Sequence, residues 1–312
     1  MGSGRACPKG LVSGAMKDVA SKLVVGTAAL GMAYGLPRNS ASSAIAPEEH
    51  EARAIVEGAL AKGLTTFDTA PAYGESEMRL GRALEGRGRV WTKVGPPKGE
   101  VSWLEHAHQS LEVSYERLGR RRIELLQFHN WSRAWEEAAD FRQAWETLRK
   151  DPRVEALGAT TYGVDDARAA VRSGLFRVVQ VEWNLLNQRV IREVGQEARD
   201  QGVHLAVRSV YLQGALTEEG RALPNKARLR EGVEQARRRA QERNLSLTTL
   251  ALGAALRSEQ ISFVLVGIDR TAQVQEALAV AEGIEAWTLE EPTLASLDLG
   301  GIPEADPRFW TA

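Results

Sequence analysis

The chain has 312 residues, of which 43% are hydrophobic and 26% are charged, as in an ordinary globular protein. Its formal net charge of −1 argues against a nucleic-acid partner or an anionic membrane surface. The single cysteine, Cys7, excludes an intrachain disulfide and favours a cytoplasmic location, and no apolar run reaches the ~18 residues of a membrane span.

The first 21 residues contain Lys9, Lys17 and Asp18 and lack the apolar core of a signal peptide. We expect residues 1–21 to form an N-terminal extension or a short hairpin. Residues 22–312 are expected to form one folded domain.

Short β-rich runs recur from there onwards, and a longer amphipathic stretch follows each of them. Several runs are apolar at consecutive positions, which is typical of parallel strands buried on both faces. Eight strands are predicted, at 23–26, 64–68, 89–94, 123–129, 155–160, 178–182, 204–208 and 261–266.

The stretches between these runs are predicted to be helices. In residues 48–62 the apolar side chains recur with helical spacing and form one stripe. Pro47 and Gly63 stand at the positions that these residue types favour at a helix start and just past a helix end. Two helices, over 226–243 and 248–257, are expected before the last strand.

Eight strand–helix repeats without a linker predict a single-domain (β/α)8 TIM barrel, an α/β fold. The alternative is a doubly wound open sheet, whose glycine fingerprint is approached at residues 26–31. In that fold the glycine-rich turn opens a long helix directly. Here Tyr34, Gly35 and Pro37 follow, and these are loop residues, so the barrel is favoured.

Polar residues stand where the predicted strands end, which is where such barrels carry their active sites. Asp68 ends the second strand, Tyr73 follows it, Lys93 lies near the end of the third, and His129 ends the fourth. Each has an ordinary alternative, such as a surface lysine, a loop tyrosine or a core histidine. Their joint occurrence on neighbouring strands favours a site.

This set of residues suits the reduction of a carbonyl group. A carbonyl that accepts a hydride gains negative charge on oxygen and needs a proton, which a tyrosine hydroxyl can donate. A nearby lysine cation favours the phenolate that remains. Asp68 would keep Lys93 charged, and His129 would bind the substrate oxygen. The hydride would come from a nicotinamide.

Three motifs carry a family resemblance: Phe-Asp-Thr-Ala-Pro-Ala-Tyr-Gly-Glu-Ser-Glu at 67–77, Trp-Thr-Lys at 91–93 and Leu-Leu-Gln-Phe-His-Asn at 125–130. With them the chain resembles the aldo/keto reductase superfamily from about residue 22 to 282, and its opening at 25–35 resembles a bacterial branch. The family's catalytic tetrad falls on Asp68, Tyr73, Lys93 and His129. The resemblance implies NAD(P)H-dependent reduction of an aldehyde or ketone, with a sugar or secondary-metabolite carbonyl among the candidates.

The resemblance also implies a set of cofactor contacts. Thr160 and Thr161 replace the family's Ser-Asn pair at the carboxamide, and Gln180 matches its second contact. Arg208 replaces the stacking tyrosine; a guanidinium can stack on a ring, and its charge would favour the reduced nicotinamide. The loop 209–214 would cover the pyrophosphate. The remaining implied contacts are Gly26, Thr27, Ala28, Asp68, Ser209, Tyr211, Gln213, Gly214, Gly267, Asp269, Arg270, Gln273 and Glu276.

The adenosine end gives mixed signals. Arg270 could bind a 2′-phosphate, which favours NADPH, whereas the carboxylate of Asp269 favours the bare ribose of NADH. We expect NADPH, with NADH as the alternative. Candidate substrate-pocket residues are Met32, Tyr34, Trp131 and Trp183.

A metal site is not expected, because His106 and His108 lie two apart on a predicted helix and no Cys/His ligand spacing occurs. Two other functions stay open: NAD-dependent oxidation of a sugar hydroxyl, and a low-turnover cofactor-binding regulatory subunit. The expected partner is a small carbonyl compound, and the chain is expected to be a monomer or a small homo-oligomer. The loop residues that would determine the substrate follow no pattern from which it could be identified.

Overall fold

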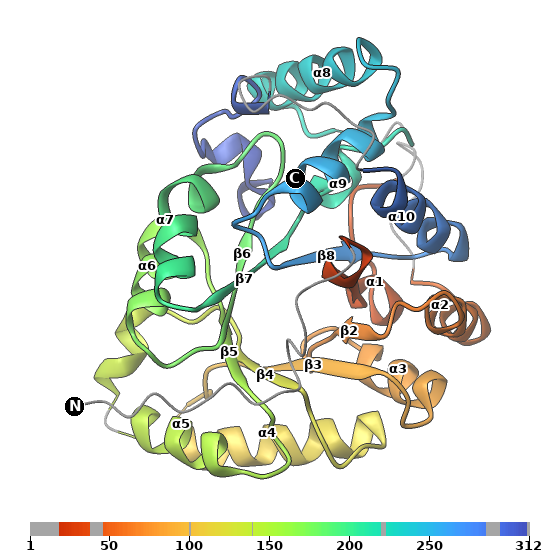
Figure 1. Cartoon of the computed structure of the whole chain (residues 1–312). Helices are drawn as coiled ribbons and strands as arrows, with labels where there is room; N and C mark the ends of the chain where they lie inside the picture. The colour runs from red at the N-terminus through yellow and green to blue at the C-terminus, as the bar shows by residue number, and fades with distance from the viewer. Residues whose placement is uncertain are drawn as a thin grey trace.

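The computed structural model describes residues 19–37, 46–99, 101–138, 140–219, 223–284 and 294–310. Eight parallel strands close into a barrel in chain order, because β8 pairs with β1 as well as with β7 (Figure 1). This confirms the predicted (β/α)8 fold. The strands are β1 Leu23–Gly26, β2 Thr66–Asp68, β3 Arg89–Val94, β4 Leu125–Phe128, β5 Leu157–Thr160, β6 Val178–Glu182, β7 His204–Arg208 and β8 Phe263–Gly267.

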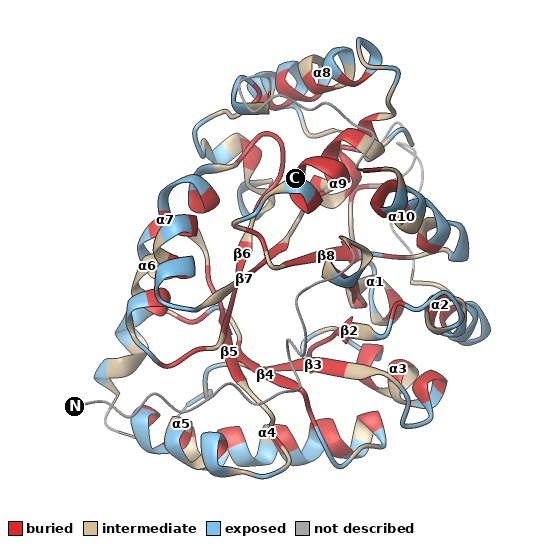
Figure 2. Ribbon diagram, in the orientation of Figure 1, coloured by how far each residue is buried: buried red, intermediate tan, exposed pale blue. Residues whose placement is uncertain are grey.

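Helices surround the barrel, and Figure 2 shows their outer faces exposed and the strands buried. The α-helices are α1 Ala28–Gly31, α2 Glu49–Ala61, α3 Ser76–Leu84, α4 Trp103–Leu118, α5 Phe141–Lys150, α6 Gly163–Arg172, α7 Arg189–Asp200, α8 Ala227–Gln241, α9 Leu247–Arg257 and α10 Thr271–Gly283. Short 3₁₀ turns are η1 Val19–Lys22, η2 Arg133–Glu137, η3 Leu212–Gly214, η5 Pro303–Ala305 and η6 Pro307–Phe309.

The predicted elements agree closely with the observed ones. The ranges 23–26, 89–94, 178–182 and 204–208 are matched in full by β1, β3, β6 and β7, and the three helices predicted over 48–62, 226–243 and 248–257 are α2, α8 and α9. The strands β4 and β5 begin two residues later than predicted, and Ile123, at the predicted start of β4, pairs with Val154 only through an isolated bridge. After β1 the chain forms the single turn α1 and then a loop, rather than the long helix of an open sheet.

The predicted extension over residues 1–21 lies largely outside the described residues, which begin with η1. At the end of η1, Lys22 Nζ donates to the carbonyl oxygens of Leu256 at 2.9 Å and Ser258 at 3.0 Å. These bonds attach the start of β1 to the end of α9, where carbonyl groups lack helical partners.

The barrel interior changes from apolar to polar along the strands. Because side chains alternate between two faces, residues two positions apart share the inner face. The residues here termed the apolar floor are Trp91, Leu125, Val178, Ala206 and Phe263, and the Trp91 and Phe263 rings meet edge-on at 5.0 Å. Two residues further along their strands stand Lys93, Gln127 and Gln180. The polar inner positions therefore lie at the carboxyl ends of the strands, above this floor.

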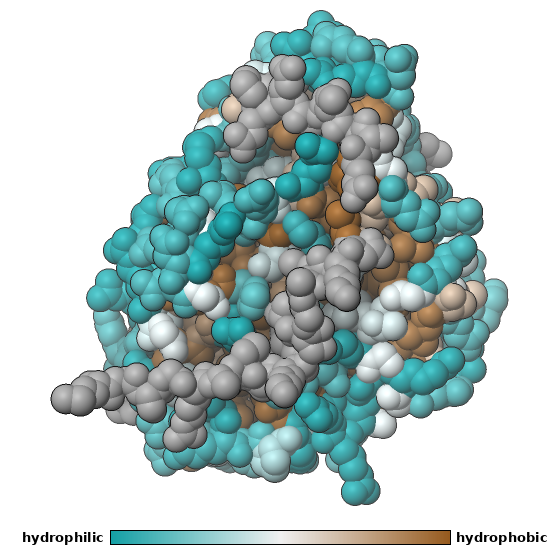
Figure 3. Space-filling model, viewed as in Figure 1, coloured by the Kyte–Doolittle hydropathy of each residue, from teal (hydrophilic) through white to brown (hydrophobic). Residues whose placement is uncertain are grey.

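The outer surface is mainly hydrophilic on the face that Figure 3 shows, with teal side chains around the perimeter. Across the described ranges, no helix combines the length and the hydropathy that a membrane crossing requires.

Candidate active site

Lys93 and Asp68 form a buried ion pair at the carboxyl end of the barrel. Lys93 Nζ donates to Asp68 Oδ1 at 2.5 Å and to the carbonyl oxygen of Thr69 at 2.8 Å, and the two charged residues are only 1% and 3% exposed. A buried ammonium is costly unless it is paired, and here it has two oxygen partners. Burial alone would lower the pKa of Lys93, but the Asp68 carboxylate and the Tyr73 hydroxyl outweigh it and raise that pKa above its ordinary value.

The second carboxylate oxygen of Asp68 is bound by two amides. Gln127 Nε2 donates to Asp68 Oδ2 at 2.8 Å, and Gln180 Nε2 donates to the same oxygen at 3.1 Å and to Gln127 Oε1 at 2.9 Å. Asp68 is thus held at both oxygens from three other strands. Gln127 was missed in the sequence, although its place two residues after the inward-facing Leu125 indicates an inner position.

Tyr73 lies beside this pair, in the loop between β2 and α3. Lys93 Nζ is 4.8 Å from the centre of the Tyr73 ring, and the ring of His129 meets the Tyr73 ring edge-on at 6.0 Å. The four predicted catalytic residues are therefore brought together.

Two glycines allow the Tyr73 loop to pack against the chain after β1. A Cβ on Gly31 would come within 2.1 Å of Ser76 N and 2.2 Å of Tyr73 O. Gly74 has a φ of +58°, and a Cβ there would come within 2.3 Å of Gly31 O. The hydroxyl of buried Ser76 adds side-chain bonds to Thr27 at 2.7 Å and to Thr69 at 3.0 Å. The position of Tyr73 is therefore set by backbone contacts that no larger residue would permit.

His129 follows β4 and faces the same space. Its backbone N–H donates to Val94 O at 2.8 Å, which continues the β3–β4 pairing. Burial, followed by the positive charges of Lys93 and Arg208, lowers the pKa of His129 to about 3. The imidazole is consequently neutral at physiological pH, so that it can donate or accept a hydrogen bond without adding charge.

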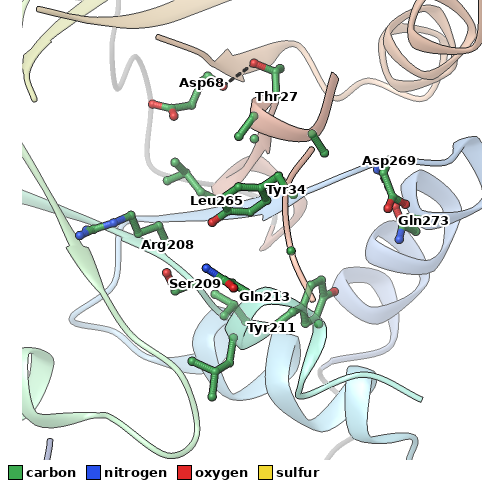
Figure 4. A pocket seen from close by; sticks show the side chains of 18 of the residues that line it. Thr27, Tyr34, Asp68, Arg208, Ser209, Tyr211, Gln213, Leu265, Asp269 and Gln273 are labelled. Carbon is green, nitrogen blue, oxygen red and sulfur yellow. Dashed lines mark hydrogen bonds between the residues drawn. The ribbon is translucent and has the colours of Figure 1, made fainter. Parts of the chain in front are cut away.

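A cavity, here termed the main cavity, runs from Tyr73 past the ends of β1 and β8 (Figure 4). It is lined from one side by Gly26, Thr27 and Ala28 and from the other by the loop 209–214. Of the predicted cofactor contacts, thirteen line it: Gly26, Thr27, Ala28, Asp68, Gln180, Arg208, Ser209, Tyr211, Gln213, Gly214, Gly267, Asp269 and Gln273. Leu265 and Thr217 also line it and were not predicted.

The loop after β7 has an unusual backbone. Ser209, Leu212 and Gln213 have φ values of +64°, +47° and +54°, in the left-handed region that residues with a Cβ seldom occupy. Gln213 O also accepts the backbone N–H of Leu36 at 2.9 Å, which joins this loop to the one after β1 across the cavity. Strained backbone of this kind is frequent in loops that bind ligands, where the surrounding structure maintains it.

The side chain of Arg208 contacts residues of β6 and of the segment that follows β5. Its guanidinium donates to Thr161 O at 2.9 Å and Gln180 O at 3.3 Å, and it packs on the Tyr162 ring at 4.3 Å. In Figure 4 it points away from Leu265 and Tyr34. Thr161 is buried and is not among the residues that line the main cavity, but its Oγ1 has no hydrogen-bond partner among the described residues. Thr160 Oγ1 accepts the Asn130 N–H at 2.7 Å.

A second cavity, here termed the acidic cavity, adjoins the far end of the main one and shares Tyr211, Thr217 and Gln273 with it. It contains the predicted contact Glu276 together with Glu218 and Glu219, which were not predicted. Arg270 is not among its described lining residues.

A third cavity, here termed the polar cavity, opens on the other side of Tyr73. It is lined by side chains that can form hydrogen bonds, and the segment 305–308 closes one side of it. Its polar lining includes Tyr34, His129, Asn130, Thr160, Tyr162, Glu182, Asn184, Asn187, Arg208 and Arg308. Most of these were not predicted, because a C-terminal residue such as Arg308 reaches the site only through the fold.

Of the four residues predicted to line the substrate pocket, only Tyr34 lines the main or the polar cavity. Tyr34 lines both the main and the polar cavity, whereas Met32 is 38% exposed and lines neither. Trp131 and Trp183 are 1% and 4% exposed and are likewise absent from the lining, so the structure does not place them as pocket walls. Strand alternation explains Trp183, which follows the inward Glu182 and so faces the helices.

Trp131 is turned outward by the backbone that precedes it. Asn130 has a φ of +60°, and Trp131 N donates to Thr160 O at 2.8 Å. The indole consequently packs against Phe176 at 5.4 Å, in the layer between strands and helices.

The amino-acid sequence was compared with protein-family models and with known proteins, and both comparisons found similar sequences. The model of the aldo/keto reductase family matches residues 22–286. An L-galactose dehydrogenase of Arabidopsis thaliana is 26% identical, covering 80% of this chain and 84% of that protein. An NADH-specific methylglyoxal reductase of Escherichia coli K12 is 24% identical (70% and 78% covered), and a D-threo-aldose 1-dehydrogenase of a Pseudomonas species is 27% identical (78% and 88%).

The fold is shared with solved structures. A crystal structure of a Pseudomonas aeruginosa protein superposes with a TM-score of 0.61 at 21% identity, over 85% of this chain and 90% of that one.

Proposed function

Because this chain belongs to the aldo/keto reductase family, we propose that it reduces an aldehyde or ketone with a nicotinamide dinucleotide and that Tyr73 donates the proton. The observation that carries this proposal is the convergence of Asp68, Lys93, Tyr73 and His129 where the main and polar cavities meet. The E. coli relative named a methylglyoxal reductase supports carbonyl reduction.

The lining of the main cavity suits a dinucleotide. Glycines at the ends of β1 and β8 leave the backbone open, and Ser209, Thr217 and Gln213 offer hydroxyl and amide groups for ribose and diphosphate oxygens. The cavity then continues into the acidic cavity, which gives it the elongated form that two joined nucleotides need. When bound, the reduced nicotinamide supplies the hydride that attacks the carbonyl carbon.

The side chains account for the proton. The Tyr73 Oη–H bond breaks as that proton moves to the substrate oxygen, which leaves a phenolate beside Lys93. The ammonium is kept charged by Asp68 and stabilises the phenolate. His129, neutral at physiological pH, donates a hydrogen bond to the substrate oxygen and orients it.

A second candidate reaction, oxidation of a sugar hydroxyl, is favoured by the polar cavity. Asn130, Asn184 and Asn187 line this cavity beside Tyr73 and could bind several hydroxyl groups of one substrate. Two of the relatives are named as dehydrogenases of sugars, L-galactose and D-threo-aldoses. The same residues would then act in reverse, with the Tyr73 phenolate accepting the hydroxyl proton while the hydride on the same carbon would pass to an oxidised nicotinamide dinucleotide.

The test compares wild type with Tyr73→Phe. Wild type should oxidise reduced dinucleotide in the presence of small aldehydes or reduce the oxidised form in the presence of aldoses. Tyr73→Phe should lower kcat by about 10²–10⁴-fold, the usual contribution of a positioned acid, and should still bind the dinucleotide. A variant that kept its turnover would refute the role of Tyr73 as proton donor.

A further inference from the structure

The helix α3 begins three residues after Tyr73, and its first two residues, Ser76 and Glu77, are buried polar residues. The Tyr73 carbonyl oxygen accepts the backbone N–H of Ser76 at 3.1 Å, so the turn that presents Tyr73 is continuous with the start of this helix. A contact that fixes the first turn of α3 therefore also restrains Tyr73.

Glu77 joins this helix to the strand that carries Lys93. Thr92 Oγ1 donates a hydrogen bond to Glu77 Oε1 at 2.6 Å, and both residues are buried. Because side chains alternate along a strand, Thr92 points from β3 towards the helices, while the next residue, Lys93, points into the barrel. The bond therefore connects the backbone beside Lys93 with the helix that follows Tyr73.

We propose that Glu77 is a positioning residue, which sets the distance between Tyr73 and Lys93 through its bond to Thr92. The inference rests on the proposed function, in which loss of the Tyr73 proton leaves a phenolate beside the Lys93 ammonium. The electrostatic stabilisation of that phenolate depends on the distance between the two groups. A small displacement of α3 relative to β3 should therefore slow the chemical step.

The bonding of Glu77 is suited to positioning rather than to stability. Its second oxygen, Oε2, is buried and forms no hydrogen bond within the described ranges, and Arg117 of α4 lies 3.6 Å from it. A buried carboxylate that is incompletely bonded costs free energy, and an apolar side chain of similar size in such a place is often no less stable. An apolar side chain cannot, however, supply the directional bond to Thr92.

Ser76 restrains the same turn against other parts of the barrel. Its hydroxyl is hydrogen-bonded to Thr27 and Thr69, which follow β1 and β2. Glu77 adds a direct bond to β3, the strand of Lys93. The two first residues of α3 thus fix the Tyr73 turn relative to three strands, and Glu77 provides the reference to the ammonium.

The experiment measures the rate of a single turnover at saturating NADH or NADPH, with methylglyoxal and benzaldehyde as carbonyl probes, because this rate separates chemistry from product release. Thr92→Val keeps the shape of the side chain and removes the hydroxyl. It should lower the rate at least about tenfold, since a misplacement of about 1 Å can cost about 10²-fold. The dissociation constant of the dinucleotide, measured by tryptophan fluorescence, should change less than about twofold.

Two substitutions of Glu77 separate the bond from the mere presence of the side chain. Glu77→Leu should lower the rate as far as Thr92→Val does, and combining the two should add nothing, because both remove one bond. Glu77→Gln keeps an oxygen that can accept the Thr92 hydroxyl, so its rate should stay within about threefold of wild type.

Glu124→Leu is the matched control. Glu124 is likewise buried, accepts a bond from β3 at 2.6 Å, donated by Val90 N, and lies 3.6 Å from an arginine, Arg120. Val90 stands near the amino end of the strand, away from Lys93. This variant should therefore lower the urea midpoint but leave the single-turnover rate within about twofold of wild type.

The inference is overturned if Thr92→Val keeps the wild-type rate, whether or not Glu77→Leu folds. It is also overturned if Glu124→Leu slows the reaction as much as Glu77→Leu, or if Glu77→Gln is as slow as Glu77→Leu. In each of these cases an inactive Tyr73→Phe leaves the proposed function standing. Wild type that binds neither dinucleotide and reduces neither probe overturns both.

Discussion

Replacing Lys93 by methionine should destabilise the fold by about 3–5 kcal/mol, the usual cost of leaving one member of a buried ion pair alone. The substitution keeps the volume of the side chain but removes its bonds to Asp68 Oδ1 and Thr69 O. Asp68 then keeps only the two amide bonds at Oδ2 and has an unpaired charge on a residue that is only 3% exposed.

The double variant Lys93→Met/Asp68→Asn removes both charges and keeps an oxygen for Gln127 and Gln180 to bind. Its loss of stability should therefore be smaller than the sum of the two single losses by about 2–3 kcal/mol, the coupling expected of contacting charges. Lys22→Met is the matched control, because Lys22 bonds two carbonyl oxygens and no carboxylate. It should cost only about 1–2 kcal/mol.

The assay is urea unfolding, followed by tryptophan fluorescence and by circular dichroism so that coincident curves test two-state behaviour. If the single losses add in the double variant, or if Lys93→Met costs no more than Lys22→Met, the ion pair does not have the energetic role derived from its geometry.

Two further predictions concern the neighbouring residues. The folded chain holds the pKa of His129 at about 3, below the ordinary 6.5. The unfolded chain therefore takes up this proton first, and the stability due to neutral His129 is complete above about pH 6.5 and is lost as the pH falls towards 3. His129→Gln should flatten the acid side of a plot of urea midpoint against pH, and an unchanged slope would contradict the assignment. Gly31→Ala should lower both stability and kcat, because its Cβ would displace Tyr73 O and Ser76 N. Gly95→Ala, where a Cβ meets nothing within 4 Å, should do neither, and equal effects of the two variants would show that the Tyr73 loop does not depend on this contact.

The barrel and its four central residues could be predicted because both depend on local patterns. Strand ends are marked by alternation and by the switch to loop residues, so Asp68, Lys93 and His129 could be placed on one rim before any contact was known. The same alternation could have identified Gln127, which lies on the inner face with Leu125.

The substrate side could not be predicted in this way, because its residues come together only through long-range contacts. Arg308 lies over the Tyr162 ring at 3.8 Å although the two are far apart in the chain. Trp131 was misplaced because the left-handed backbone at Asn130 reverses the direction that its position after a strand end suggests. No pattern in the sequence indicates a role for Glu219. It forms an ion pair with Arg270, the residue that the sequence analysis expected at a 2′-phosphate.

The apolar floor separates Lys93 from the amino ends of the strands. The Trp91 and Phe263 rings pack edge-on one layer below the polar inner positions, and the two residues are 1% and 7% exposed. On the mechanism proposed above, the proton that Tyr73 gives up should therefore be replaced from the side of the main and polar cavities, which both reach Tyr73. Reprotonation of the tyrosine and departure of the alcohol should then take place on the same side of the barrel, and turnover should depend on the order in which they happen.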